Sequence, residues 1–158
     1  MNVHLRAAIE TDAQAAAMIL IRTRAQFMPY APAAHSEAEI RDWVRAQLIP
    51  SGGVVVAVQE HSPIGVMATS SGDGCSWVDQ MAVMPEHVGR GVGSKLLAYA
   101  LNSLAPPIRL YTFQANAGAR RFYESHGFVA IELTDGRENE ERCPDVLYEH
   151  RRSRHTDG

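Results

Sequence analysis

A glycine-rich segment from Pro85 to Leu97, PEHVGRGVGSKLL, is the feature that most constrains the fold. An apolar run, Trp77 to Val83, precedes it, and the amphipathic run Ser94 to Leu104 follows it. Glycines let backbone amides approach an anion closely, and the first turn of a helix presents the positive end of its dipole. A strand, a glycine turn and a helix in this order predict a phosphate-binding turn. A plain strand-to-helix connection remains the alternative interpretation.

Two common phosphate loops do not fit these letters. A P-loop needs lysine directly after its second glycine, but here Ser94 separates Gly93 from Lys95. A dinucleotide fingerprint would start at Gly89 and Gly91, and it then needs glycine or alanine where Ser94 stands. The kind of phosphate therefore has to be inferred from the rest of the chain.

Composition excludes several classes of protein. With 158 residues, 46% hydrophobic and 21% charged, the chain is expected to form one domain over residues 1–150, followed by a flexible tail over 151–158. A net charge of -3 without a lysine-rich block argues against a nucleic-acid partner. No leader and no long apolar run are evident, which predicts a cytoplasmic protein without a membrane partner. Two cysteines and seven scattered histidines predict neither a disulfide framework nor a metal site.

Apolar periodicity and capping residues predict an α/β fold with the order β-α-α-β-β-β-α-β-α-β-β. Ser36 and Glu39 form a capping-box pattern, Asn116 can cap a later helix, and Gly127 can end it. Helices are predicted over 13–27, from 36 to about 48, 94–104 and 117–126. Strands are predicted over 3–7, 54–59, 64–70, 77–83, 108–113, 128–133 and 146–150. The sheet should be mixed and mostly antiparallel, with helices on both faces.

Two separated motifs give the chain a family resemblance. The glycine loop aligns with [QR]-x-x-G-x-[GA] over residues 88–93, directly after the strand that ends at Val83. A second pattern, N-x-x-A-x-x-F-Y-x-x-x-G-F, is present as Asn116, Ala119, Phe122, Tyr123, Gly127 and Phe128. With both motifs in this order, the chain resembles the GNAT superfamily of acyl-CoA-dependent N-acyltransferases up to about His150. The segment from Phe122 to Tyr148 is further similar to a group of small bacterial GNAT proteins whose substrates are mostly unassigned.

The resemblance implies an enzyme that moves an acetyl group from acetyl-CoA to an amine by direct attack, through a tetrahedral intermediate. It also implies a coenzyme A site on the strand, the glycine loop and the following helix start, comprising Met81, Ala82, Val83, Val88, Gly89, Arg90, Gly91, Val92, Gly93, Ser94 and Asn116. Val88 stands where the family usually has Gln or Arg, so one side-chain contact is expected to be missing. Arg90 and Lys95 either add charge near the phosphates or are solvated cations. Asn116 can cap its helix, contact the cofactor, or do both.

Acyl transfer needs a base for the amine and an acid for the leaving thiolate. By resemblance, Tyr123 is the general acid, although its ring could instead pack in the core beside Phe122. Asp79 is a candidate base because it lies two residues from Met81, on the same face of a regular strand. A structural partner for an arginine is the alternative role for Asp79. His87, in the loop, is a further candidate base or a solvated side chain.

Family precedent places the acceptor between the loop after the first helix and a loop near the C-terminus. These segments contain Phe27, Tyr30 and His35, and Glu138, Glu140, Glu141 and Asp145. Such an acidic rim would favour a cationic small amine or an exposed peptide amine, unless it is a plain polar loop. A homodimer is also compatible with the family. Two other functions stay open: a non-catalytic acyl-CoA-binding or sensing module, and a nucleotide-binding domain that uses the same glycine turn.

Overall fold

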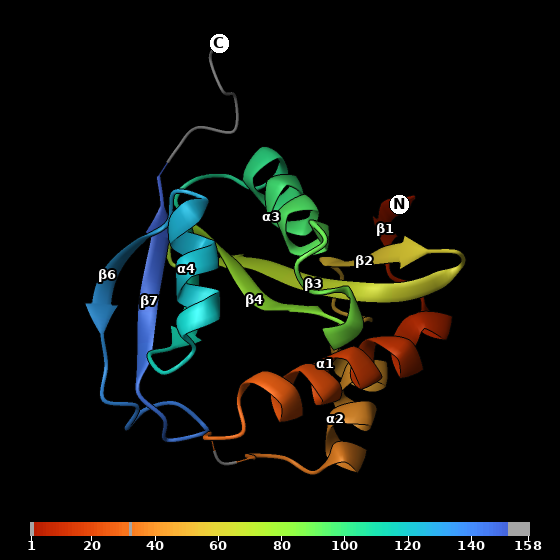
Figure 1. Cartoon of the computed structure of the whole chain (residues 1–158), viewed down its shortest axis with the longest axis horizontal. Helices are drawn as coiled ribbons and strands as arrows, with labels where there is room; N and C mark the ends of the chain where they lie inside the picture. The colour runs from red at the N-terminus through yellow and green to blue at the C-terminus, as the bar shows by residue number, and fades with distance from the viewer. Residues whose placement is uncertain (1, 32, 152–158) are drawn as a thin grey trace.

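The computed structural model describes residues 2–31 and 33–151, and it consists of a seven-stranded sheet between two layers of helices (Figure 1). Residues 152–158 of the predicted tail lie outside the described residues. The strands are β1 (Val3–Ala7), β2 (Val54–Gln59), β3 (Ser62–Gly72), β4 (Cys75–Val83), β5 (Ile108–Phe113), β6 (Val129–Leu133) and β7 (Asp145–His150). The helices are α1 (Ala13–Phe27), α2 (Glu37–Trp43), α3 (Val92–Ser103) and α4 (Ala117–Ser125), with short turns η1 (Glu10–Asp12), η2 (Val44–Leu48) and η3 (Pro85–His87).

The sheet has the strand order β1-β2-β3-β4-β5-β7-β6. Every neighbouring pair is antiparallel except β4 and β5, which are parallel. This arrangement confirms the predicted α/β class, the mixed and mostly antiparallel sheet, and the order of the elements. Among the described residues, no helix is both long enough and apolar enough to cross a membrane.

Two hydrophobic cores lie on opposite faces of the sheet. The α3/α4 core contains Leu96, Leu97 and Tyr123, whereas the α1/α2 core contains Ile19 and Val44. Strand β2 contributes to both cores, because its side chains alternate between the faces and residues 54–58 are all buried. An uninterrupted apolar run, rather than an alternating one, is therefore what this central strand requires.

Residues close in the sequence define where helices α2, α3 and α4 begin. The Glu39 amide donates to Ser36 Oγ at 3.1 Å and the Ser36 amide donates to Glu39 Oε1 at 2.8 Å, which confirms the capping box. The Ala119 amide donates to Asn116 Oδ1 at 3.2 Å, which confirms the cap of α4. Helix α3 begins two residues before the predicted start, because Gly91 adopts a left-handed φ of 86° and serves as its N-cap.

Candidate active site

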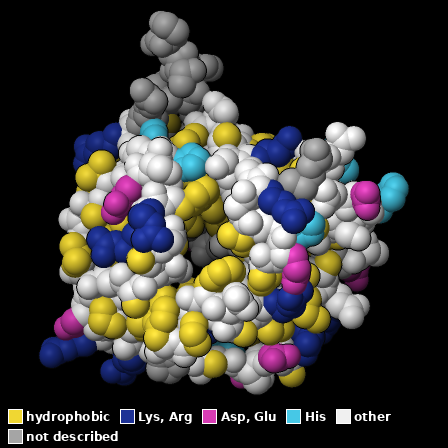
Figure 2. Space-filling model, viewed as in Figure 1, with side chains coloured by type: hydrophobic (Ala, Val, Ile, Leu, Met, Phe, Trp, Pro, Cys, Tyr) yellow, Lys and Arg dark blue, Asp and Glu magenta, His cyan; other side chains and the backbone are white. Residues whose placement is uncertain are grey.

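The central feature of the site is a cleft where β4 and β5 separate. These two parallel strands pair only at Ser76 with Ile108 and at Trp77 with Arg109. Beyond these pairs, residues 78–83 of β4 keep β3 as a neighbour but have no strand on their other side. The cleft has a volume of about 1550 Å³, and it opens at the surface as a hollow bordered by hydrophobic side chains (Figure 2). Unpaired β4 backbone groups therefore face an accessible cavity.

A bulge in β4 lies at the point where the strands separate. Ala68 of β3 pairs with Gln80, whereas Thr69 pairs with Val78, so Asp79 is an extra residue on β4. As a result, Val78 and Met81 contact the same α3/α4 core although they are three residues apart. Regular alternation therefore does not determine on which face Asp79 lies, because a bulge interrupts the period of two.

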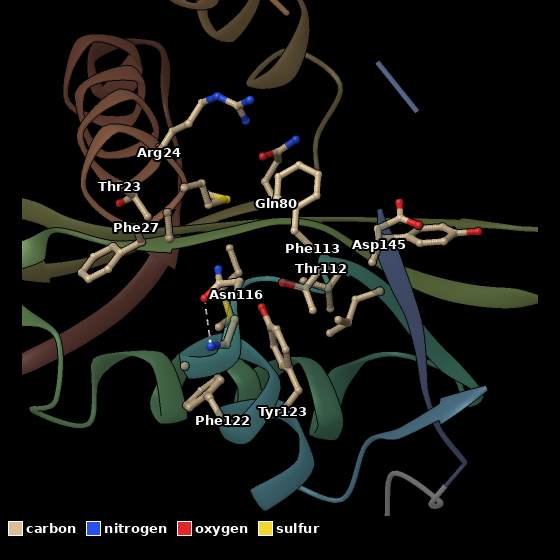
Figure 3. A pocket seen from close by; sticks show the side chains of 18 of the residues that line it. Thr23, Arg24, Phe27, Gln80, Thr112, Phe113, Asn116, Phe122, Tyr123 and Asp145 are labelled. Atoms are coloured by element: carbon tan, nitrogen blue, oxygen red, sulfur yellow. Dashed lines mark hydrogen bonds between the residues drawn. The ribbon is translucent and has the colours of Figure 1, made fainter. Parts of the chain in front are cut away.

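Asp79 nevertheless lines the cleft, and it is exposed. Its carboxylate has no hydrogen bond or ion pair with another described residue, so the alternative role as an arginine partner is not observed. Its neighbour Gln80 also lines the cleft, on the side of α1, where Arg24 lies (Figure 3). The bulge thus places two polar side chains at the mouth of the gap between the strands.

The glycine loop presents a row of open backbone amides. Lys95 is the first residue of α3 whose amide has a backbone acceptor, and it donates to O of the N-cap residue Gly91 at 3.0 Å. Among the described residues, the amides from Gly89 to Ser94 have no backbone acceptor. Gly89 and Gly91 have φ values of 83° and 86°, a conformation that disfavours other residues. Consecutive unpaired amides at a helix N-terminus are suited to bind an anion.

The loop residues predicted to hold the cofactor have three different roles. Val88, Gly89, Gly91, Gly93 and Ser94 line the cleft, as do residues 81–83 of β4. The side chain of Val92 is instead buried in the α3/α4 core, and Val92 does not line the cleft. Arg90, Lys95 and His87 do not line the cleft. Val88 is 50% exposed and can give only an apolar contact.

Helix α4 brings Phe122, Tyr123 and Asn116 to the other wall of the cleft (Figure 3). A Cβ atom at Gly93 would lie 3.2 Å from Phe122 Cζ, so the absence of a side chain there lets α4 pack against the first turn of α3. Asn116 lines the cleft while it caps its helix, which shows that the two roles proposed for it are compatible.

Tyr123 combines the two roles that the sequence left open. Its ring is 92% buried in the α3/α4 core, with edge contacts to Phe122 and Phe128. Its hydroxyl has no hydrogen bond with a described residue and points into the cleft between Asn116 and Thr112 (Figure 3). Burial raises the pKa of Tyr123 to about 12, because the phenolate would lose its hydration. The hydroxyl therefore keeps its proton at every physiological pH.

The α1–α2 loop and the β6–β7 loop, which are the two segments assigned to the acceptor, contact each other beside the cleft. His35 Nε2 lies 3.0 Å from Glu140 Oε2, and Arg24 Nη1 lies 3.5 Å from Glu141 Oε2. Tyr30 packs edge-on against Phe113, with ring centroids 6.2 Å apart. Tyr30 and His35 do not line the cleft themselves, whereas Phe27, Glu138, Glu140 and Glu141 do. Tyr30 and His35 thus support β5 and the β6–β7 loop, whereas Met28, directly after α1, lines the cleft.

Asp145 was expected in the acidic rim, but it has a structural role. It is buried, its carboxylate accepts hydrogen bonds from Thr134 Oγ1 and, at 3.1 Å, from Asn139 Nδ2, and so it shapes the β6–β7 loop. Two cleft residues that the sequence analysis missed, Thr23 and Arg24, lie four and three residues before Phe27 on α1. That helical spacing is the signal that could have found them.

The fold and the cleft define a class of α/β protein with a glycine loop of open backbone amides beside a split sheet. The sequence model of the acetyltransferase (GNAT) family matches residues 17–128. The chain therefore belongs to the GNAT family, an acetyltransferase family that uses acetyl-CoA. No curated protein matches the sequence significantly.

Solved structures share the fold over nearly their whole length. YjaB from Escherichia coli is 24% identical, with a TM-score of 0.77, covering 95% of this chain and 98% of YjaB. The PaiA N-acetyltransferase from Thermoplasma acidophilum, solved in complex with coenzyme A, is 19% identical, with a TM-score of 0.73, covering 96% of this chain and 100% of PaiA. The ribosomal-protein-S18-alanine N-acetyltransferase from Escherichia coli is 19% identical, with a TM-score of 0.74, covering 99% of this chain and 97% of that enzyme.

Proposed function

We propose that the protein transfers an acetyl group from acetyl-CoA to the nitrogen of an amine acceptor. The observation that carries this proposal is the meeting, in one cleft, of three features: open glycine-loop amides, unpaired β4 backbone and the Tyr123 hydroxyl. Two structural neighbours are named N-acetyltransferases, which supports nitrogen as the acceptor atom. When bound, acetyl-CoA supplies the thioester carbonyl that the amine attacks.

The residues present fit this cofactor. Amides from Gly89 to Ser94 would hold the pyrophosphate, because charge-assisted hydrogen bonds to backbone amides suit phosphate oxygens. Met81 and Val83, on the edge of β4 that has no neighbouring strand, would hydrogen-bond the pantetheine arm in the manner of a missing strand, and Val83 O also accepts from Thr23 Oγ1 at 3.2 Å. Val88 adds apolar surface where a polar side chain would have added a contact, so we expect a weaker site rather than a lost one.

Tyr123 and Asp79 would handle the two protons of the reaction. The hydroxyl of Tyr123 stays neutral because of its raised pKa, so it can donate to the sulfur as the carbon–sulfur bond breaks. Asp79 has a free carboxylate at the bulge and would take the amine proton, directly or through one water molecule. The open amides of β4 beside the bulge could donate to the developing oxyanion.

A cationic amine is the acceptor class that the charges favour. Among the described residues that line the cleft, seven are carboxylates and only Arg24 and Arg137 are cations. The carboxylates are Asp79, Glu132, Asp135, Glu138, Glu140, Glu141 and Asp145. Glu138 is exposed and pairs with no described residue, so it can meet a positively charged acceptor.

The test is to measure coenzyme A release from acetyl-CoA with a panel of amines. Removal of a positioned acid or base is expected to slow turnover by about 10²- to 10⁴-fold, so Tyr123→Phe and Asp79→Asn should both lower kcat. If neither variant changes the catalysed rate, the chemistry assigned to these residues is wrong. Tight binding of acetyl-CoA without turnover across a broad panel would instead support a non-catalytic acyl-CoA-binding module.

A further inference from the structure

His126 links the end of α4 to the glycine loop, and the family motif gives this position no fixed residue. Its Nδ1 atom lies 2.8 Å from Phe122 O, and its Nε2 atom lies 3.1 Å from Ser94 Oγ. The imidazole also packs on the Phe122 ring, with centroids 4.5 Å apart. Ser94 lines the cleft, and its amide is one of the amides without a backbone acceptor. The imidazole therefore contacts a residue of the candidate anion site without lining the cleft itself.

The partners of His126 determine where its protons lie. A carbonyl oxygen can only accept, so Nδ1 carries a hydrogen and donates it to Phe122 O. In the neutral ring, Nε2 then has no hydrogen and accepts one from the Ser94 hydroxyl. The Ser94 proton consequently points away from the cleft. This orientation is the wrong one for a phosphate, because phosphate oxygens accept hydrogen bonds and need a donor.

We propose that His126 is a positioning residue that turns Ser94 into a donor for the cofactor pyrophosphate, an inference that rests on the proposed function. When the phosphates bind at the loop, Nε2 takes up one proton from solvent. The imidazolium then donates to Ser94 Oγ, and the Ser94 hydroxyl donates to a phosphate oxygen. No other bond changes, and His126 itself does not touch the cofactor.

Near His126, the bound phosphates would supply the negative charge that favours the imidazolium. Its polar contacts are Phe122 O and the hydroxyls of Ser94 and Ser125, and no described carboxylate pairs with the ring. The charged side chains on the segments that meet at this ring are Arg90 and Lys95 beside Ser94, and Arg120, Arg121 and Glu124 on α4. None of these five forms a hydrogen bond with the imidazole.

Proton uptake on binding can be measured by titration calorimetry in two buffers of different ionisation enthalpy. The probe is dephospho-CoA, because its pyrophosphate has no proton to exchange near neutral pH. The wild-type protein is expected to take up as much as about one proton at pH about 7.5. In 15N-histidine-labelled wild-type protein, NMR should show Nε2 of His126 gaining a hydrogen as dephospho-CoA is added.

Three variants separate the contributions. His126→Gln offers an amide that can donate to Ser94 without titrating, so it should bind dephospho-CoA within about threefold of wild type but take up no proton. His126→Ala and Ser94→Ala lose the donor and should each weaken binding about tenfold. Ser125→Ala is the matched control, because this hydroxyl contacts Nδ1 but not Ser94, and it should change neither quantity.

His87 is the other histidine beside the loop, and its Nδ1 atom is buried without a hydrogen-bond partner. His87→Gln should therefore keep the proton uptake. Uptake that persists in His126→Gln, or that disappears in His87→Gln instead, would overturn the assignment to His126, as would an unchanged NMR signal in the wild-type protein. A wild-type protein that does not bind dephospho-CoA or acetyl-CoA at all would overturn the proposed function as well.

Discussion

Two buried tyrosines in the α3/α4 core have different expected roles, one in the stability of the fold and the other in the chemistry of the cleft. The hydroxyl of Tyr148 donates to Glu124 Oε2 at 2.6 Å and accepts from Arg120 Nε at 3.0 Å, and its side chain is fully buried. The hydroxyl of Tyr123 has no such partner and faces the cleft. Only the first hydroxyl therefore stabilises the fold through hydrogen bonds, whereas the second is free to meet a ligand.

Tyr148→Phe should consequently affect stability, whereas Tyr123→Phe should affect turnover. Tyr148→Phe is expected to lower the free energy of unfolding by about 1 to 2 kcal/mol, because it removes hydrogen bonds to two charged groups, and to leave kcat nearly unchanged. Tyr123→Phe is expected to change stability by less than about 0.5 kcal/mol while it slows turnover. Urea unfolding and steady-state kinetics on both proteins test this. A large loss of stability in Tyr123→Phe would show that its hydroxyl has a structural role.

Sequence reasoning at the scale of single residues succeeded where a residue's role depends on its neighbours in the chain. Ser36 and Asn116 each cap a helix by accepting from a backbone amide three residues on, so local patterns reveal them. It did not reveal the bulge at Asp79 or the contact made by His126. The direction of Asp79 depends on pairing with β3, and the contact of His126 with Ser94 joins residues 32 positions apart.

At the scale of elements, a partly buried ion pair joins the end of β1 to the start of α1. The guanidinium of Arg6 donates two hydrogen bonds to Asp12, at 2.7 and 2.9 Å, and the Ile9 amide donates a third at 2.8 Å. The Asp12 side chain is only 6% exposed. Hydrogen bonding to Arg6, more than the Ile9 amide, lowers the pKa of Asp12 below its ordinary value.

This lowered pKa makes the contribution of Asp12 dependent on pH. The ionised form is favoured in the folded state, so its stabilisation is complete above the ordinary value of about 3.9 and is lost as pH falls through the lower folded-state pKa. Asp12→Asn keeps an acceptor for the Ile9 amide but removes the charge. We expect it to cost about 1.5 to 3 kcal/mol at neutral pH and much less near pH 2.

Urea unfolding of wild type and Asp12→Asn at both pH values measures this difference. Asp42→Asn is the matched control, because Asp42 forms an exposed pair with Arg45 at 3.3 Å and should contribute less than about 0.5 kcal/mol. An equal cost of Asp12→Asn at neutral and acidic pH would show that the ion pair is not the source of the stability.

The elements themselves were largely predictable, but the cleft was not. Strands and helices follow from periodicity and caps, as α1 and β5 show by matching their predicted bounds. β4 and β5 diverge after two paired positions, and the bulge at Asp79, which is set by pairing with β3, lies where they separate. No local pattern encodes such contacts, so only the family resemblance pointed to this part of the chain.

At the scale of the whole molecule, the charge is unevenly distributed. The chain has a net charge of only -3, yet the described side chains that line the cleft include seven carboxylates and two guanidinium groups. Several of these carboxylates are engaged, with Glu140 beside His35, Glu141 beside Arg24 and Asp135 beside Arg137. Glu138 pairs with no described residue, so its negative charge remains available on the acceptor side of the cleft.

This field predicts a salt-dependent KM for acceptors with a second positive charge. For such a diamine, KM should rise as the ionic strength increases from about 0.02 to 0.5 M, because screening shortens the range of the attraction. Glu138→Gln should raise that KM about two- to fivefold at low salt, with a smaller effect at high salt and little change in kcat. Glu10→Gln, a charge change at an exposed residue that does not line the cleft, is the control. A KM that responds neither to salt nor to Glu138→Gln would contradict a cationic acceptor, whereas a matched response from Glu10→Gln would assign the effect to net charge rather than to the cleft.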